Sequence, residues 1–101
     1  MLELDFTFQN EVWVYSASKA SWHMVTVPSG MSADIKAFTK HLAKGFRSVK
    51  VTAAIGATRW TTSLFPDSKS GCYFLPLKAS VRQAEDISKG DEVSVHLQVD
   101  I

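Results

Sequence analysis

The sequence is poor in cysteine, glycine and proline. Cys72 is its one cysteine in 101 residues, so no intramolecular disulfide can support the fold, and the composition suits a reducing, cytoplasmic compartment. With five glycines and three prolines, the chain has no Pro/Gly/Ser linker or low-complexity segment that would separate two domains. We therefore expect residues 1–101 to form a single domain with one hydrophobic core.

An excess of charge of one sign is also absent. Eleven lysines and arginines balance ten aspartates and glutamates to a net charge of +1, which gives no general support to binding of a nucleic-acid backbone. No apolar run approaches the roughly 20 residues that span a bilayer. The N-terminus, MLELDFTFQNE, alternates apolar and acidic residues, unlike a secretory signal. We expect no membrane partner.

Alternation of apolar and polar residues predicts strands over most of the chain. The polar run from Ser16 to Ala20 is expected to break the first strand, and Pro28 and Pro76 are expected to end the second and fifth. Gly56-Ala57-Thr58 predicts a tight hairpin connection, and Gly90-Asp91 predicts a turn stabilised by the aspartate. The expected strands cover residues 2–15, 22–27, 49–55, 59–65, 72–75 and 93–99.

Two segments have helical character instead. The first has apolar residues at i, i+3 and i+7, namely Ile35, Phe38 and Leu42. Ser32 is its expected N-cap and Gly45 its C-terminal stop, which gives about three turns. The second covers Lys78 to Glu85, with Val81 and Ala84 expected to face inward.

The order of these elements is β-β-α-β followed by β-β-α-β. The pairs Val27-Pro28 and Leu75-Pro76 occupy the same place in the two halves, which indicates a repeat of architecture. Six short strands in two similar halves favour a mainly β, closed or nearly closed barrel, because closure removes exposed strand edges. The two helices are expected to cap its open ends.

The segments SWHMVTVP, RWTTSLFP and GCYFLPLKASVRQAEDISKGDEVSVHL together resemble the bacterial and archaeal family called domain of unknown function 1905. The resemblance covers nearly the whole chain. It implies a pseudo-barrel of the double-split type, a fold shared with DNA-binding transition-state regulators and antitoxins. Some members of the family are fused to a module resembling bacteriocin-protection or YdeI-like domains, and the resemblance leaves open whether this chain acts with a separate domain of that type. The family has no established activity that the resemblance could imply for this chain.

The chemically reactive residues do not form a recognisable catalytic or metal-binding set. His23, His41 and His96 lack the spacing of metal ligands, and Cys72 is best interpreted as a small apolar strand residue. Ser63 lacks the flanking glycines of a nucleophile elbow. We expect no metal, no cofactor and no enzyme.

A small group of cationic and aromatic residues is the candidate ligand site: Arg59, Trp60, Ser63, Lys78 and Arg82. Lys78 and Arg82 are one helical turn apart, and their cations suit a carboxylate or phosphate, with the Trp60 indole available for stacking. The competing interpretation is a solvated helix face beside a core tryptophan. Trp13 and Trp22 would in either case cover the barrel.

The sequence thus favours binding of a small anionic ligand or peptide. The alternative is a nucleic-acid-binding or regulatory module, which rests on fold analogy alone. A homodimer fits either hypothesis, since Phe65, Tyr73 and Phe74 are more apolar material than a small barrel needs.

Overall fold

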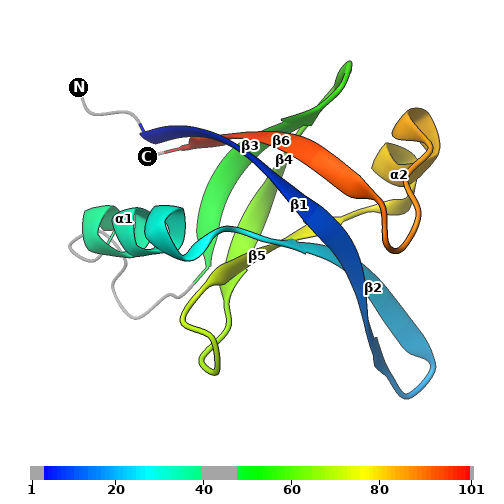
Figure 1. The fold of residues 1–101 in the computed structure, drawn as a ribbon, viewed down its shortest axis with the longest axis horizontal. Helices are drawn as coiled ribbons and strands as arrows, with labels where there is room; N and C mark the ends of the chain where they lie inside the picture. The colour runs from blue at the N-terminus through cyan, green and yellow to red at the C-terminus, as the bar shows by residue number, and fades with distance from the viewer. Residues whose placement is uncertain (1–3, 40–47, 101) are drawn as a thin grey trace.

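The computed structural model describes residues 4–39 and 48–100. It contains six strands and two short helices, in the predicted β-β-α-β-β-β-α-β order (Figure 1). The strands are β1 (Leu4–Ala17), β2 (Ala20–Thr26), β3 (Val49–Ile55), β4 (Thr58–Pro66), β5 (Tyr73–Leu77) and β6 (Glu92–Val99). The helices are α1 (Ser29–Thr39) and α2 (Ala79–Glu85), which lie on opposite sides of the strands.

The six strands close into one antiparallel barrel in the order β1-β2-β5-β4-β3-β6. The long strands β1 and β4 are each divided between two neighbours. Residues 4–11 of β1 pair with β6, and residues 12–17 pair with β2. Residues 58–64 of β4 pair with β3, and residues 65–66 pair with β5. The barrel thus consists of a first sheet containing β6 and β3 and a second sheet containing β2 and β5, which is the double-split arrangement.

The predicted repeat is present in the topology. Exchanging β1 with β4, β2 with β5 and β3 with β6 leaves the order of the strands around the barrel unchanged. The two prolines, however, do not occupy equivalent places. Pro28 lies between β2 and α1, whereas Pro76 lies inside β5 opposite Met24, so the prediction that Pro76 ends a strand is wrong.

Alternating residues of every strand point into one core. Among the fully buried side chains are Val25, Val51, Leu64, Leu75 and Leu97. Removing this much apolar surface from water is the main stabilising term of such a domain. Within the two described ranges, no helix combines the length and the apolar character that crossing a bilayer requires.

The first helix begins earlier than its sequence predicted. α1 starts at Ser29, directly after Pro28, and the Ser32 backbone N–H already donates to the Pro28 carbonyl at 2.8 Å. Ser32 is therefore inside the helix and is not its N-cap. Its buried hydroxyl donates to the Val27 carbonyl and accepts from the Tyr73 N–H, both at 3.0 Å, which joins α1 to β5 and to the residue that follows β2. Gly45, Leu42 and His41 lie outside the described residues.

Three further expectations need correction. The polar run after Tyr15 continues the strand: β1 reaches Ala17 and β2 begins at Ala20, because Ser18 takes a left-handed conformation (φ 58°) that permits a tight hairpin. Cys72 precedes β5 instead of belonging to it. Ala84 is exposed.

The segment after α2 agrees better with its prediction. Val81 is buried as expected, and the chain leaves α2 through Asp86 in a left-handed conformation (φ 54°), which lets Ile87 fill the core in place of Ala84. Gly90 has φ 90°, a conformation that favours glycine. The Asp91 carboxylate accepts from the Ser88 N–H at 2.8 Å, so its predicted role in the turn is confirmed.

Candidate functional site

Arg82 is the best placed of the candidate residues. It lies half-buried on α2, and its Nε donates to the carbonyl of Leu77 at 3.1 Å, which holds the guanidinium against the end of β5. In the described part of the chain the one ion pair joins His96 to Asp5, so Arg82 has no carboxylate partner there. A fixed guanidinium without an internal counter-charge is suited to an anion from outside.

His23 lies beside this arginine. It is opposite Leu77 in the pairing of β2 with β5, so both His23 and Arg82 adjoin the same residue. Burial, and secondly the positive charge of Arg82, lower the pKa of His23 below its ordinary value of 6.5. Its Nδ1 atom is buried and has no hydrogen-bond partner among the described residues. The imidazole is therefore neutral at neutral pH and retains an unused polar atom.

Lys78 is the third residue of this group. It is exposed at the N-cap of α2, and its carbonyl accepts from the Arg82 N–H at 3.1 Å. Glu85 forms no ion pair with either cation in the described part of the chain; its carboxylate instead accepts from the Thr58 hydroxyl at 2.5 Å and joins α2 to β4. We call Lys78, Arg82 and His23 the cationic corner.

The other three candidates lie elsewhere. Arg59 and Trp60 are neighbours in β4, so their side chains leave opposite faces of the strand. Trp60 is 7% exposed and belongs to the core, with its Nε1 unpartnered among the described residues, whereas Arg59 is exposed. Ser63 lies on the same outer face of β4 as Arg59, because the two residues are four positions apart in the strand. The structure does not bring Arg59 together with the Trp60 indole, and a ligand-binding role for Arg59, Trp60 and Ser63 stays a prediction.

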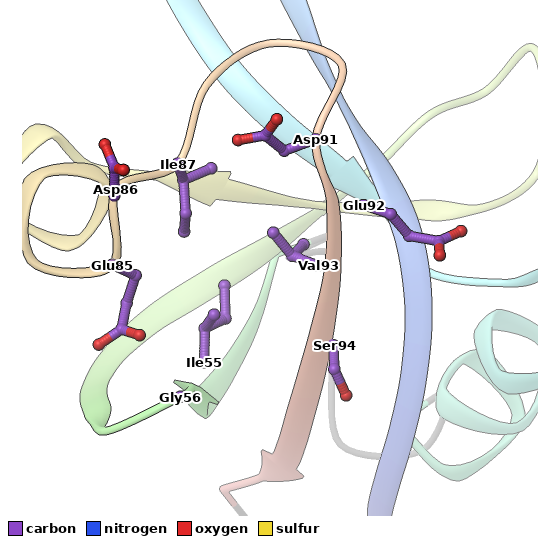
Figure 2. A pocket seen from close by; sticks show the side chains of 9 residues that line it. All are labelled: Ile55, Gly56, Glu85, Asp86, Ile87, Asp91, Glu92, Val93 and Ser94. Atoms are coloured by element: carbon purple, nitrogen blue, oxygen red, sulfur yellow. The ribbon is translucent and has the colours of Figure 1, made fainter.

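A hollow of about 400 Å³ lies at the other end of α2, between this helix, the β3–β4 turn and the start of β6 (Figure 2). Ile55, Ile87 and Val93 point toward one another and form its apolar floor, as Figure 2 shows. Four acidic residues contribute to its lining, Glu85, Asp86, Asp91 and Glu92, and the Glu92 side chain points away from the hollow in Figure 2. Sequence reasoning missed this hollow, although four acids between residues 85 and 92 were a visible signal.

Two of the carboxylates at the hollow, those of Glu85 and Asp91, have structural partners. Glu85 bonds Thr58, and Asp91 stabilises the turn before β6. The Glu85 side chain lies so close to the β3–β4 turn that a Cβ at Gly56 would collide with the Glu85 carboxylate. No group of His, Cys, Asp or Glu within residues 4–39 and 48–100 is arranged to hold a metal ion. The hollow is thus an acidic surface feature, opposite in charge to the cationic corner.

The remaining reactive residues are solitary or paired at the surface. His96 on β6 pairs with Thr7 of β1, and Asp5 pairs with Gln98, so His96 and Asp5 are diagonal neighbours; they form an exposed pair with Nε2 and Oδ1 2.5 Å apart. Cys72 is half-buried, and its carbonyl accepts from the Asp67 N–H at 2.8 Å. Neither forms part of a catalytic arrangement with the groups described above.

Topology and site together define a small closed antiparallel barrel of two β-β-α-β halves with a cationic corner beside its second helix. The family model described as "Domain of unknown function (DUF1905)" matches residues 8–97, and the chain belongs to this family. The resemblance found in the sequence is therefore confirmed. No match is found among the curated proteins.

Proposed function

We propose that this barrel binds a small anionic ligand, through a carboxylate or phosphate group, at the cationic corner. The observation that carries the proposal is the state of Arg82: its guanidinium is held by the Leu77 carbonyl and has no acidic partner in the described chain. Arginine offers five N–H donors, and only Nε is used by Leu77, so the outer donors remain for an oxyanion.

His23 and Lys78 support the same chemistry. The buried Nδ1 atom of His23 has no hydrogen-bond partner among the described residues, and exposed Lys78, one helical turn from Arg82, adds a second positive charge. An anion bound beside His23 would favour its charged form, and would therefore raise the pKa that burial and Arg82 lower. This coupling gives the proposal a specific spectroscopic signature.

The proposal keeps Lys78 and Arg82 from the sequence-based site and adds His23. Arg59 and Ser63 would form a separate polar surface on the outside of β4, and their participation is a subordinate part of the proposal. We further propose a cytoplasmic location, which the single cysteine, Cys72, supports. No observation favours the nucleic-acid alternative.

The test is an NMR titration of the His23 ring signals over pH, with and without millimolar inorganic phosphate, and separately with citrate. We expect either anion to raise the His23 pKa. Arg82→Gln should abolish the change and Lys78→Gln should reduce it, whereas Arg59→Gln, which removes the same charge from the outer face of β4, should leave it intact.

Two results would contradict the proposal. One is a His23 pKa that neither anion alters; the other is equal loss in Arg59→Gln and Arg82→Gln, which would indicate unspecific charge attraction. Thermal unfolding of each variant shows whether the Arg82→Gln protein is folded, and Lys78→Gln, at an exposed position, provides the same test without touching the Leu77 hydrogen bond.

A further inference from the structure

A second apolar cluster lies outside the barrel, on the outer face of the second sheet. Its residues come from β1, β2, β4 and β5 and point away from the core: Trp13, Tyr15, Trp22, Met24, Phe65 and Phe74. We call this surface the aromatic face. The prediction that Trp13 and Trp22 cover the barrel agrees with this placement, and part of the face is on the β1–β2 hairpin that extends from the barrel (Figure 1).

The aromatic face is continuous and packed. The rings of Phe65 and Phe74 are 6.1 Å apart, those of Phe74 and Trp13 are also 6.1 Å apart, and those of Tyr15 and Trp22 are 5.7 Å apart. Met24 lies between these groups and is only 7% exposed, although it does not belong to the core cluster. An outward residue is this well buried only when its neighbours cover it, so the surface is preformed.

Much of this face is nevertheless open to water. Tyr15 is 52% exposed, Trp22 44% and Phe65 43%. An exposed apolar patch of this kind is often functional. None of the six residues is charged, and charged groups are likewise depleted at the centres of protein interfaces. The face therefore suits a neutral partner.

Its hydrogen-bonding capacity is small. Trp13 already donates through Nε1 to the Thr26 hydroxyl at 2.9 Å, which leaves the Tyr15 hydroxyl and the Trp22 indole N–H for a partner. A sugar would need many more donors and acceptors to replace the water on its hydroxyl groups. The Tyr15 hydroxyl and the Trp22 indole N–H, two donors among apolar rings, suit a peptide segment that has few polar groups.

The size of the face separates a peptide from a second copy of this chain. The three most exposed rings together offer roughly 300 Å². A stable interface needs about 800 Å² from each partner. From β1 to β4 the face crosses three strand spacings, or about 14 Å. A polyproline II segment of about five residues has the same length, and its carbonyls project outward, unbonded within the segment.

We propose that the aromatic face binds an uncharged, proline-containing extended segment of another protein. Its proline rings stack on the aromatic side chains, and the Trp22 indole and the Tyr15 hydroxyl donate to its carbonyls, the kind of contact by which aromatic residues of known domains recognise polyproline II helices. This site is independent of the cationic corner, since it contains none of its residues.

The test is titration of ¹⁵N-labelled protein with a capped proline decamer, with a capped Gly-Ser decamer as the control peptide. We expect the indole N–H signal of Trp22 to shift with the proline peptide alone, while that of buried Trp60 stays in place. Trp22→Ser and Phe65→Ser, both at exposed positions, should each weaken binding at least about tenfold. Thr61→Ala, on the outside of the first sheet, should leave binding unchanged.

Several outcomes would overturn the proposal. These are no Trp22 shift at millimolar peptide, equal shifts with the Gly-Ser peptide, or a larger shift with a maltooligosaccharide. Sedimentation provides a further one: a dimer of the unliganded protein that Trp22→Ser dissociates would make this face a self-interface.

Discussion

The two sheets of the barrel share one core but present different surfaces to solvent. On the outside of the first sheet lie Asp5, Thr7, Thr61 and His96, all exposed; on the outside of the second lie the rings of the aromatic face. β1 crosses from one to the other, and its outward residues change from Asp5, Thr7, Gln9 and Glu11 to Trp13 and Tyr15. A barrel needs apolar side chains only on its inner face. The outward aromatic residues are therefore not explained by the fold, and this difference is what points to a partner.

The largest expected effect contrasts the inside and the outside of the second sheet. Leu75→Ala should lower the free energy of unfolding by about 3 kcal/mol, because it leaves a cavity among fully buried residues. Phe65→Ala on the neighbouring strand should cost about 1 kcal/mol or less, since Phe65 is already 43% exposed. Urea denaturation measures both. Equal costs would mean that the outer aromatic residues are as structural as the core.

The next contrast is between the two outer surfaces. Met24→Ala should lower the free energy of unfolding by about 2 kcal/mol, because Met24 is buried among the other residues of the aromatic face. Thr61→Ala, at an exposed position of the first sheet, should change stability by no more than about 0.5 kcal/mol. If Met24→Ala were as mild as Thr61→Ala, the aromatic face would be a set of separate side chains and not a packed surface.

A smaller effect involves pH. Burial and Arg82 lower the pKa of His23, so the unfolded chain takes up this proton at a higher pH than the folded protein. The stability of the wild type should be constant above the ordinary pKa of 6.5, fall as the pH drops through 6.5, and level off below the lowered folded pKa. His23→Gln removes this decline, and the comparison is made by urea denaturation across the pH range. If acidification instead made the wild type more stable relative to His23→Gln, the pKa of His23 would be raised by folding, and the expectation would be contradicted.

The smallest effect concerns the polar surface. Asp5→Asn should reduce stability by no more than about 0.5 kcal/mol, because both members of the His96–Asp5 pair are about half exposed and water screens their attraction. Thermal unfolding at low and high salt measures this. A loss comparable with that of Met24→Ala would reverse the proposed ranking of the two surfaces.

The fold was predictable because its signals are local. Alternation in Val49–Ile55 and Glu92–Val99, the glycine turns at Gly56 and Gly90, and the family segments all led to the correct barrel. The errors arose where tertiary contacts overrule local preference. Ser32 is a favourable N-cap in isolation, but its hydroxyl instead bonds Val27 and Tyr73. The hydrogen bond with Tyr73 exists only once β5 is in place.

The candidate site was only partly predictable. That Arg59 and Trp60 face opposite ways follows from strand alternation alone, and the sequence was sufficient to separate them. The meeting of His23 with Arg82 depends on the register of β2 against β5, which no local pattern specifies. The aromatic face could not be predicted without the same register, because its Trp13–Phe74 contact joins residues from different halves of the repeat.

The pairing of Leu4 with Val99 also has a consequence for biosynthesis. β6 fills the gap between β1 and β3, so the ring cannot close until Val99 has left the ribosome. Until then β1 and β3 each present an open edge on which other nascent chains could add a strand. Closure must therefore wait until β6 has emerged, and because it joins β1 to a strand far away in the sequence, it should be a slow step of folding.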